Sequence, residues 1–245
     1  MDVTGTAALV TGAARRVGRG IALALAEAGC DVAVHYHRSA SEAEAVVEQI
    51  RRLGRRAAAI EGNLADRDVP GWVVEETVRQ LGRLDVLVNN ASVFDAGAVE
   101  EWTTEQWERT FQVNTIAPAM LARAAAAHMR HAGRGRIINL ADILAERPIR
   151  RFAAYCASKA ALVSLTRSLA RELAPTITVN AVAPGIAIFP EHYDQTLREE
   201  LVGRVPLQRA GTPEEIAAVV RFLVTTGDYI TGQVIAVDGG RSVVP

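Results

Sequence analysis

Short apolar runs alternate along the chain with longer segments in which apolar residues recur at helical spacing. The short runs have the length of buried strands, and the longer segments have the period of amphipathic helices. Strands are predicted at 7–10, 32–36, 57–60, 84–88, 136–140, 177–182 and 234–237. Strands that alternate with helices are typical of right-handed crossovers and of a parallel sheet buried on both faces. We therefore predict an α/β fold, a doubly wound parallel sheet of seven strands with helices on both faces.

Polar residues mark the predicted beginnings of three helices. Ser41 and Glu44 have the spacing of a capping box, in which each side chain bonds the backbone N–H of the other residue. Thr103, three residues before Gln106, is predicted to cap a long helix that runs to about residue 131. The segment 212–214, Thr-Pro-Glu, reads as N-cap, first helical position and acidic first turn.

Composition narrows the class of protein. The chain has 245 residues, of which 49% are hydrophobic and 22% charged, as in one globular α/β domain over 1–245. A net charge of −1 provides no basic field for nucleic acid or an anionic membrane. We expect no signal peptide, membrane span or metal site. Cys30 and Cys156 suggest no disulfide framework, which favours a reducing cytoplasm.

A glycine-rich turn follows the first predicted strand and precedes a helix. It contains Gly12, Gly18 and Gly20, with Arg16 between them, and departs from the plain G-x-G-x-x-G pattern. Such a turn leaves backbone N–H groups at a helix N-terminus, where a pyrophosphate is stabilised by free donors and the helix dipole. Its position between strand and helix predicts dinucleotide binding.

The end of the second strand indicates which dinucleotide binds. An NAD enzyme needs an acidic residue there to accept bonds from the ribose hydroxyls. This chain has His37, Arg38 and Ser39, with no acid in that run. Arg38 can bond a 2′-phosphate through two N–H groups, and the other two can donate single hydrogen bonds. The run predicts NADPH, although these residues could instead be an ordinary solvated loop.

Tyr155 and Lys159 lie one turn apart on a predicted helix that extends from 152 to about 175. Their spacing places the two Cβ atoms roughly 5–6 Å apart on the same face. An ammonium near a phenol favours the phenolate, so Lys159 is expected to lower the pKa of Tyr155. Such a tyrosine can transfer a proton at working pH. The alternative is a solvated lysine beside a half-buried tyrosine.

Taken together, these motifs resemble the short-chain dehydrogenase/reductase family over essentially the whole chain. The matching elements are TGAARRVG at 11–18, NNAS at 89–92, Asn114, Tyr155 with Lys159, and Pro184-Gly185. The resemblance implies a Rossmann-type sheet, a nicotinamide cofactor and, commonly, a homotetramer. It also implies roles for Tyr155 as proton donor, for Lys159 on the nicotinamide ribose, and for Asn114 in holding a water of the proton relay. For Asn114, a plain buried hydrogen bond is the competing account.

Several positions depart from the common family pattern. Most members have glycine, glycine and serine where this chain has Arg16, Ser92 and Asp142. These departures, with HYHRS at 35–39 and Phe94 after NNAS, resemble the pteridine reductase branch. Asn63 replaces the aspartate that usually contacts adenine, and its amide oxygen can accept the same bond.

Asp142 has a chemical interpretation of its own. A ketone that receives hydride on carbon leaves negative charge on oxygen, which a carboxylate would repel and a serine hydroxyl would stabilise. A C=N bond receives the proton on nitrogen, and an acid can supply it. The alternative is a carboxylate paired with Arg147 or Arg150. Phe94 could stack on a flat ring or belong to the core.

We therefore predict NADPH-dependent reduction of a pterin C=N bond. The runner-up is a carbonyl reductase of the 3-oxoacyl-carrier-protein type, and the third alternative is a non-enzymatic NADPH sensor. The predicted catalytic residues are Asp142, Tyr155, Lys159 and Asn114. Predicted cofactor residues are Gly12, Arg16, Val17, Gly18, His37, Arg38, Ser39, Asn63, Leu64, Asn90, Ala91, Ser92, Tyr155, Lys159, Pro184 and Gly185. Predicted substrate residues are Arg16, Ser92, Phe94, Asp142 and Tyr155. The segment 185–204 is either a substrate lid or a passive surface excursion.

Overall fold

A single parallel sheet forms the centre of the computed structural model, which describes residues 1–189 and 193–244. Its seven strands lie in the order β3-β2-β1-β4-β5-β6-β7. From β1 the chain adds β2 and β3 on one side, then crosses back to place β4 on the other side of β1. The direction of winding therefore reverses between β1 and β4, which is where an open α/β sheet holds its ligands.

The observed strands agree with the predicted ones, with small differences at their ends. They are β1 (Ala7–Val10), β2 (Asp31–Tyr36), β3 (Ala57–Glu61), β4 (Val86–Asn89), β5 (Gly135–Leu140), β6 (Ile177–Pro184) and β7 (Val234–Val237). The main corrections are that β4 begins at Val86 rather than residue 84 and that β6 continues to Pro184. All neighbouring strands are parallel.

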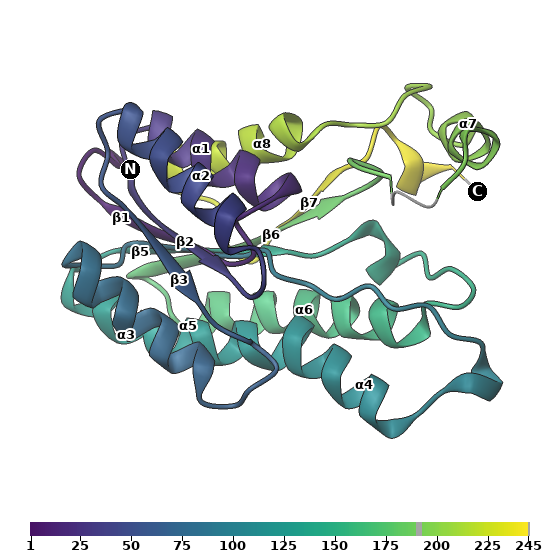
Figure 1. Ribbon diagram of the computed structural model, residues 1–245, viewed down its shortest axis with the longest axis horizontal. Helices are drawn as coiled ribbons and strands as arrows, with labels where there is room; N and C mark the ends of the chain where they lie inside the picture. The colour runs from purple at the N-terminus through teal and green to yellow at the C-terminus, as the bar shows by residue number, and fades with distance from the viewer. Residues whose placement is uncertain (190–192, 245) are drawn as a thin grey trace.

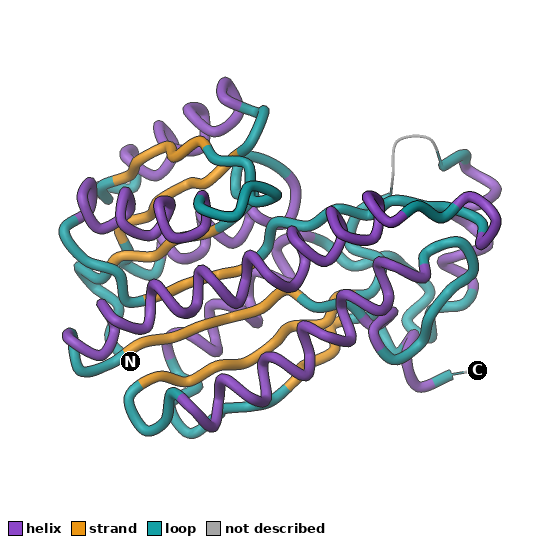
Figure 2. Tube along the Cα trace, turned by 90° about the horizontal axis from the view of Figure 1, so that it is seen from below, coloured by secondary structure: helices purple, strands orange, loops and turns teal. Residues whose placement is uncertain are grey.

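Helices cover both faces of the sheet (Figure 1). They are α1 (Arg16–Glu27), α2 (Ala40–Arg52), α3 (Val69–Leu81), α4 (Thr104–Phe111), α5 (Ala117–His131), α6 (Ala153–Glu172), α7 (Gln195–Gly203) and α8 (Pro213–Thr225). In Figure 1, α1, α2 and α8 lie above the sheet, and α3, α5 and α6 lie below it. Figure 2 shows the same layers from below.

Each face of the sheet has its own hydrophobic core, because successive strand side chains point to opposite faces. In β1, Ala8 and Val10 pack with Ile21 of α1 and Val220 of α8. Leu9, on the other face, belongs to the core formed with α3, α5 and α6. Both cores leave the carboxyl ends of the strands uncovered, and the loops that follow the strands gather there.

Two of the three predicted helix starts are correct. The hydroxyls of Thr103 and Thr212 accept backbone N–H bonds from the residues three positions on. The predicted Ser41–Glu44 capping box is wrong. Helix α2 begins at Ala40, so Ser41 already lies within its first turn and its hydroxyl donates to Glu42.

The predicted long helix 103–131 is divided in the structure. A π-helical segment, Gln112–Ile116, separates α4 from α5, and the N–H of Ala117 donates to the carbonyl of Gln112 five residues earlier. The segment contains Asn114, which is 1% exposed. A π segment inserts an extra residue into a helix and is frequent at functional sites.

Candidate active site

A wide cavity opens at the carboxyl ends of the strands, around the switch between β1 and β4. Its volume is about 960 Å³, and it is lined by the glycine turn, the end of β2 and the loops after β3, β4, β5 and β6. Every predicted cofactor and substrate residue lines it except Lys159. Lys159 and the predicted catalytic Asn114 are buried away from its surface. The chain thus brings the predicted site residues together.

The glycine turn is packed closely against the end of β4. Gly12 has a φ of +63°, and a Cβ at Gly18 would lie 2.3 Å from the Gly12 carbonyl oxygen and 2.5 Å from Nδ2 of Asn90. No residue larger than glycine fits at position 18 unless the turn moves. The first turn of α1 therefore sits directly on the Gly12 peptide.

Arg16 follows the same turn in a left-handed conformation, with a φ of +54°. A residue with a Cβ rarely adopts this conformation. Its guanidinium Nη2 donates to the carbonyl of Ile188 at 3.4 Å, in the loop after β6. Arg16 therefore reaches across the cavity rather than folding back onto the turn.

Predicted cofactor residues also lie at the ends of β2 and β3. His37, Arg38 and Ser39 all line the cavity, and Ser39 does not use its hydroxyl to cap α2. Asn63 accepts the Ala65 N–H at 3.2 Å through its Oδ1 and donates to Asp66 at 3.2 Å. Because an amide oxygen has two lone pairs, Asn63 can still accept one bond from a ligand.

Tyr155, Asp142 and Lys159 form the polar centre of the cavity. The Tyr155 hydroxyl donates to Oδ2 of Asp142 at 2.7 Å, and the Lys159 Nζ donates to the carbonyl of Leu140 at 2.7 Å. Lys159 lies 5.7 Å from the centre of the Tyr155 ring. Helix α6 presents Tyr155 and Lys159 on one face, and Asp142 comes from the loop after β5. Tyr155 and Lys159 share one face of the helix as predicted, and Asp142 lies beside them.

The expected effect of Lys159 on Tyr155 is wrong for the free protein. Burial and the adjacent Asp142 carboxylate raise the pKa of Tyr155 well above its usual value, since both disfavour the phenolate. Burial also raises the pKa of Asp142, opposed by the bonds it accepts from Tyr155 and Leu144. Burial lowers the pKa of Lys159 to about 8, opposed by the charge of Asp142. Burial is the larger cause of the raised Tyr155 pKa, and the adjacent carboxylate acts in the same direction.

The alternative partner predicted for Asp142 is also wrong. Its carboxylate accepts from the Tyr155 hydroxyl and, at 2.9 Å, from the backbone N–H of Leu144. Arg147 instead donates to the carbonyl of Val244. Asp142 is thus the N-cap of a short 3₁₀ turn, Ile143–Ala145, that holds one carboxylate oxygen and leaves the other on the tyrosine.

Asn114 makes four hydrogen bonds with its side chain. The Oδ1 accepts from the Ser92 hydroxyl at 3.1 Å and from the Val93 N–H at 2.9 Å. The Nδ2 donates to the Val93 carbonyl and the Ser158 hydroxyl, both at 3.0 Å. An asparagine amide has no further donor to offer. These are the buried hydrogen bonds of the competing interpretation. A water of the proton relay would have to bond backbone groups near Asn114 instead of this amide.

Phe94 belongs to an aromatic cluster beside the catalytic candidates. Its ring stacks on Phe152 with a centroid distance of 4.2 Å and meets the Tyr155 ring edge-on at 4.6 Å. Phe94 is nevertheless 42% exposed and lines the cavity. It is a lining residue rather than a core residue, and its predicted contact with a flat substrate stays a prediction.

Comparison with known proteins agrees with this geometry. A family model described as enoyl-(acyl carrier protein) reductase matches residues 12–242. The 3-oxoacyl-[acyl-carrier-protein] reductase FabG of Staphylococcus aureus is 41% identical over 237 residues, which cover 95% of this chain and 96% of that protein. The chain belongs to the short-chain dehydrogenase/reductase family.

Two solved structures of similar proteins contain a nicotinamide cofactor. A blue fluorescent protein from a metagenomic library, in complex with NADPH, has a TM-score of 0.91 and 39% identity over 98% of this chain and 99% of that chain. FolM alternative dihydrofolate reductase 1 from Brucella canis, complexed with NADP, has a TM-score of 0.93 and 36% identity over 100% and 96%. Both resemble this short-chain dehydrogenase/reductase over its full length.

The segment predicted as a lid is only partly described. Residues 190–192 lie outside the described residues, and the later part of the segment contains α7. Ile188 and Phe189 line the cavity, as do Tyr193 and Leu201. The choice between lid and passive excursion is not tested by this arrangement.

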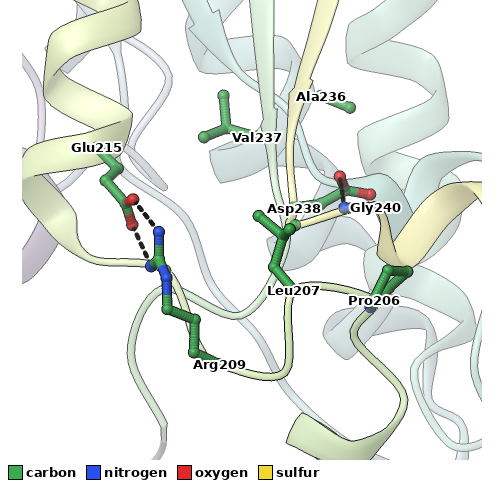
Figure 3. Close-up of a pocket in the computed structure, with 10 residues that line it drawn as sticks. Pro206, Leu207, Arg209, Glu215, Ala236, Val237, Asp238 and Gly240 are labelled. Carbon is green, nitrogen blue, oxygen red and sulfur yellow. Dashed lines mark hydrogen bonds and ion pairs between the residues drawn. The ribbon is translucent and has the colours of Figure 1, made fainter.

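A second cavity of about 470 Å³ lies near β7 and the beginning of α8 (Figure 3). Arg209 spans its edge and donates two hydrogen bonds to Glu215, at 2.9 and 2.5 Å. The Asp238 carboxylate accepts from the N–H groups of Gly240 and Ser242. The charged groups drawn there are thus already paired within the chain.

No helix among the described residues is long and apolar enough to cross a membrane. The described residues also contain no group of three His, Cys, Asp or Glu side chains placed to hold a metal ion.

Sequence reasoning missed two residues of this short-chain dehydrogenase/reductase site. His35, 2% exposed, bonds the glycine turn, and Ser158, fully buried, accepts from Asn114 and donates to the Tyr155 carbonyl at 2.7 Å. Ser158 directly precedes Lys159, and His35 precedes the predicted phosphate-binding run. Their position beside the motifs was the available signal.

Proposed function

We propose that this protein reduces a C=N bond of a pterin with NADPH. The observation that carries the proposal is the 2.7 Å hydrogen bond between the Tyr155 hydroxyl and Asp142. It places a carboxyl group with a raised pKa next to the family's proton donor. A group that is protonated more readily than usual is suited to give a proton to a ring nitrogen.

NADPH is the cofactor, and the residues present fit it. The cavity is large enough for a dinucleotide and a small substrate, and Arg38 lines it where an NAD enzyme would have an acid. When bound, NADPH supplies the hydride for the ring carbon. Arg38, with His37 and Ser39, would hold the 2′-phosphate, and Lys159 would hold the nicotinamide ribose.

The proton is the part that this chain's own residues handle. Hydride on carbon leaves the electron pair of the C=N bond on nitrogen, and one proton completes the reduction. Tyr155 would donate that proton and become a phenolate, and Asp142, once protonated from solvent, would return a proton to the phenolate oxygen. In the resting structure the phenol donates to the carboxylate. For a ketone, the same carboxylate would face a developing alkoxide and repel it.

The shape of the cavity supports a flat substrate. Phe94 is 42% exposed and lines the cavity beside Tyr155, and aromatic rings pack on one another with offset geometry. The likeness to FolM, whose name states dihydrofolate reductase activity, supports a pterin-type ring. We further propose that residues 1–245 form one domain and that the protein is a homotetramer, as is common in the family.

A second candidate is carbonyl reduction of the 3-oxoacyl-carrier-protein type. The 41% identity to FabG favours it. Asp142 opposes it, because FabG-type chemistry stabilises a negative oxygen. The two candidates predict opposite effects of replacing Asp142.

The deciding experiment is an NADPH oxidation assay with dihydrobiopterin, dihydromonapterin and an acetoacetyl thioester. Asp142→Ser should lower pterin turnover about a hundredfold, within the range for one acid–base group, and should not lower thioester turnover. Glu146→Ser, an exposed acid on the same loop, removes the same charge and should leave both rates unchanged. Rapid thioester turnover by the unmodified protein, with none for the pterins, would mean that the second candidate is correct.

A further inference from the structure

His35 bonds two successive N–H groups of the glycine turn. Its ring Nδ1 accepts from the Gly12 N–H at 3.2 Å, and its backbone carbonyl accepts from the Ala13 N–H at 2.8 Å. Since Nδ1 accepts, Nε2 carries the proton and donates to the Gly62 carbonyl at 3.0 Å. The neutral ring therefore joins the turn after β1 to the loop after β3. It does so in the interior, at 2% exposure.

These bonds determine which N–H groups remain for a ligand. The N–H groups of Gly12 and Ala13 are already used by His35. The donors left to a pyrophosphate include those at the beginning of α1, whose N-cap residue, Arg15, supplies no side-chain cap. Free N–H groups in the first turn of a helix are the usual ligands of a phosphate.

The position of those donors depends on Gly12. Its carbonyl accepts from Nδ2 of Asn90 at 3.1 Å, and Gly18 packs against the same carbonyl without room for a methyl group. Gly12 is thus held on both sides, by His35 at its nitrogen and by Asn90 at its carbonyl oxygen. A shift of Gly12 would move Gly18 and the first turn of α1.

We propose that His35 is a positioning residue for the cofactor pyrophosphate, acting through Gly12 on the first turn of α1. Its role differs from that of Arg38, which lines the cavity just beyond the same strand and would hold the 2′-phosphate. His35 serves every ligand that carries the pyrophosphate, whether or not it has a 2′-phosphate. Arg38 serves those with a 2′-phosphate.

Two amide variants separate the two bonds of the ring. His35→Asn places an oxygen where the ring has Nδ1, so the Gly12 N–H keeps an acceptor. His35→Gln places a nitrogen where the ring has Nε2, so the Gly62 carbonyl keeps its donor and the Gly12 N–H loses its acceptor. A residue that only fills space or stabilises the fold would not distinguish these variants.

The probes are ADP-ribose, which has the pyrophosphate, and adenosine 2′-monophosphate, which has the 2′-phosphate alone, with affinities measured by calorimetry. His35→Gln should weaken the affinity for ADP-ribose on the order of tenfold and change the affinity for adenosine 2′-monophosphate by less than about twofold. His35→Asn should retain most of the affinity for ADP-ribose. Arg38→Ala should show the reverse, because it should weaken only the affinity for adenosine 2′-monophosphate. Exposed His131→Gln is the control and should change neither.

The proposal would be overturned if His35→Gln kept full affinity for ADP-ribose, or if both amide variants weakened both ligands equally. If His35→Gln does not fold, amide hydrogen exchange of the unmodified protein provides the test. The Gly12 amide should already be protected without ligand, and ADP-ribose should add protection at Val17 and Gly18. Rapid exchange at Gly12 would contradict the proposal. Neither measurement depends on the reduced substrate.

Discussion

Lys159 is the only lysine in the chain, and the structure buries it to 2% exposure. Burial disfavours its ammonium form and lowers its pKa to about 8, against an ordinary value of 10.5. Below pH 8 the folded protein must hold a buried ammonium, which the unfolded chain holds in water. The free energy of unfolding therefore increases as pH rises from 8 to 10.5, because over this range the unfolded chain holds a proton on Lys159 that the folded protein has released.

Because there is one lysine, its titration can be observed without assignment. Protein labelled with lysine carrying ¹³C at the ε position should give one ε-carbon NMR signal that titrates near pH 8. In Asp142→Asn the midpoint should be lower, because the carboxylate favours the ammonium. A midpoint near 10.5 in the unmodified protein would contradict the buried position of Lys159.

The identities of the site residues could be predicted, but their mutual bonds could not. Tyr155 and Asp142 were recognised as chemically able to handle a proton, yet Asp142 has arginines nearer in sequence than its actual partner. Burial of Tyr155, together with the adjacent Asp142 carboxylate, raises the pKa that the sequence predicts to be lowered, and only the fold shows this burial. The role of His35 could not be predicted because its partners are distant in sequence: Gly12 lies well before it and Gly62 well after it.

At the scale of elements, α8 supports the cofactor side of the sheet through α1. A Cβ at Gly20 of α1 would lie 3.4 Å from Cβ of Pro213, so the two helices touch near the glycine turn. Thr212 caps α8: its hydroxyl accepts from the Glu215 N–H at 3.3 Å, and the Glu215 carboxylate accepts from the Thr212 N–H at 2.9 Å. The stability of α8 is thus linked to the packing of α1.

Thr212→Ala should destabilise the protein without changing its chemistry. Loss of an N-cap side chain costs about 1 kcal/mol. In a protein of this size that corresponds to a Tm lower by about 2–4 °C. Thermal denaturation measures it, and Thr226→Ala, an exposed hydroxyl at the other end of α8, should have a smaller effect. If cofactor affinity fell as well, helix α8 would contribute to binding more directly than its packing indicates.

Element order and sheet type followed from the alternation of apolar runs, and the comparisons support the same fold. Helix interiors were less well predicted. The apolar positions of 103–131 keep helical spacing through the π segment, so one inserted residue leaves the pattern nearly unchanged. The Ser41–Glu44 error has a similar cause, because the capping pattern recurs within a turn that had already begun at Ala40.

At the scale of the whole molecule, we expect the buried His35 to make the folded protein less stable in mild acid. Burial lowers its pKa to about 4 from 6.5. Between these pH values the unfolded chain binds a proton that the folded protein does not, so stability falls as pH decreases from 6.5 to 4. The full loss is roughly 3 kcal/mol at 1.36 kcal/mol per pKa unit.

Urea denaturation at pH 7 and pH 4.5 tests this. The unmodified protein should lose more stability between the two pH values than His35→Gln, which has no proton to bind there. Carboxylates such as Glu76, whose pKa is lowered to about 2 by the bond from Arg79, titrate equally in both proteins. Equal losses would show that His35 does not account for the acid sensitivity.

The lining of the main cavity begins at Gly12 and extends to Arg241, nearly the full length of the chain. During synthesis the chain grows at about 5–20 residues per second, so the phosphate turn emerges roughly 10 to 50 s before Arg241. A nascent chain therefore has the turn well before it has the complete cavity. A ligand that binds the native fold stabilises it by mass action. That stabilisation reaches this protein only after synthesis has passed Arg241, and the growing sheet depends on its own packing until then.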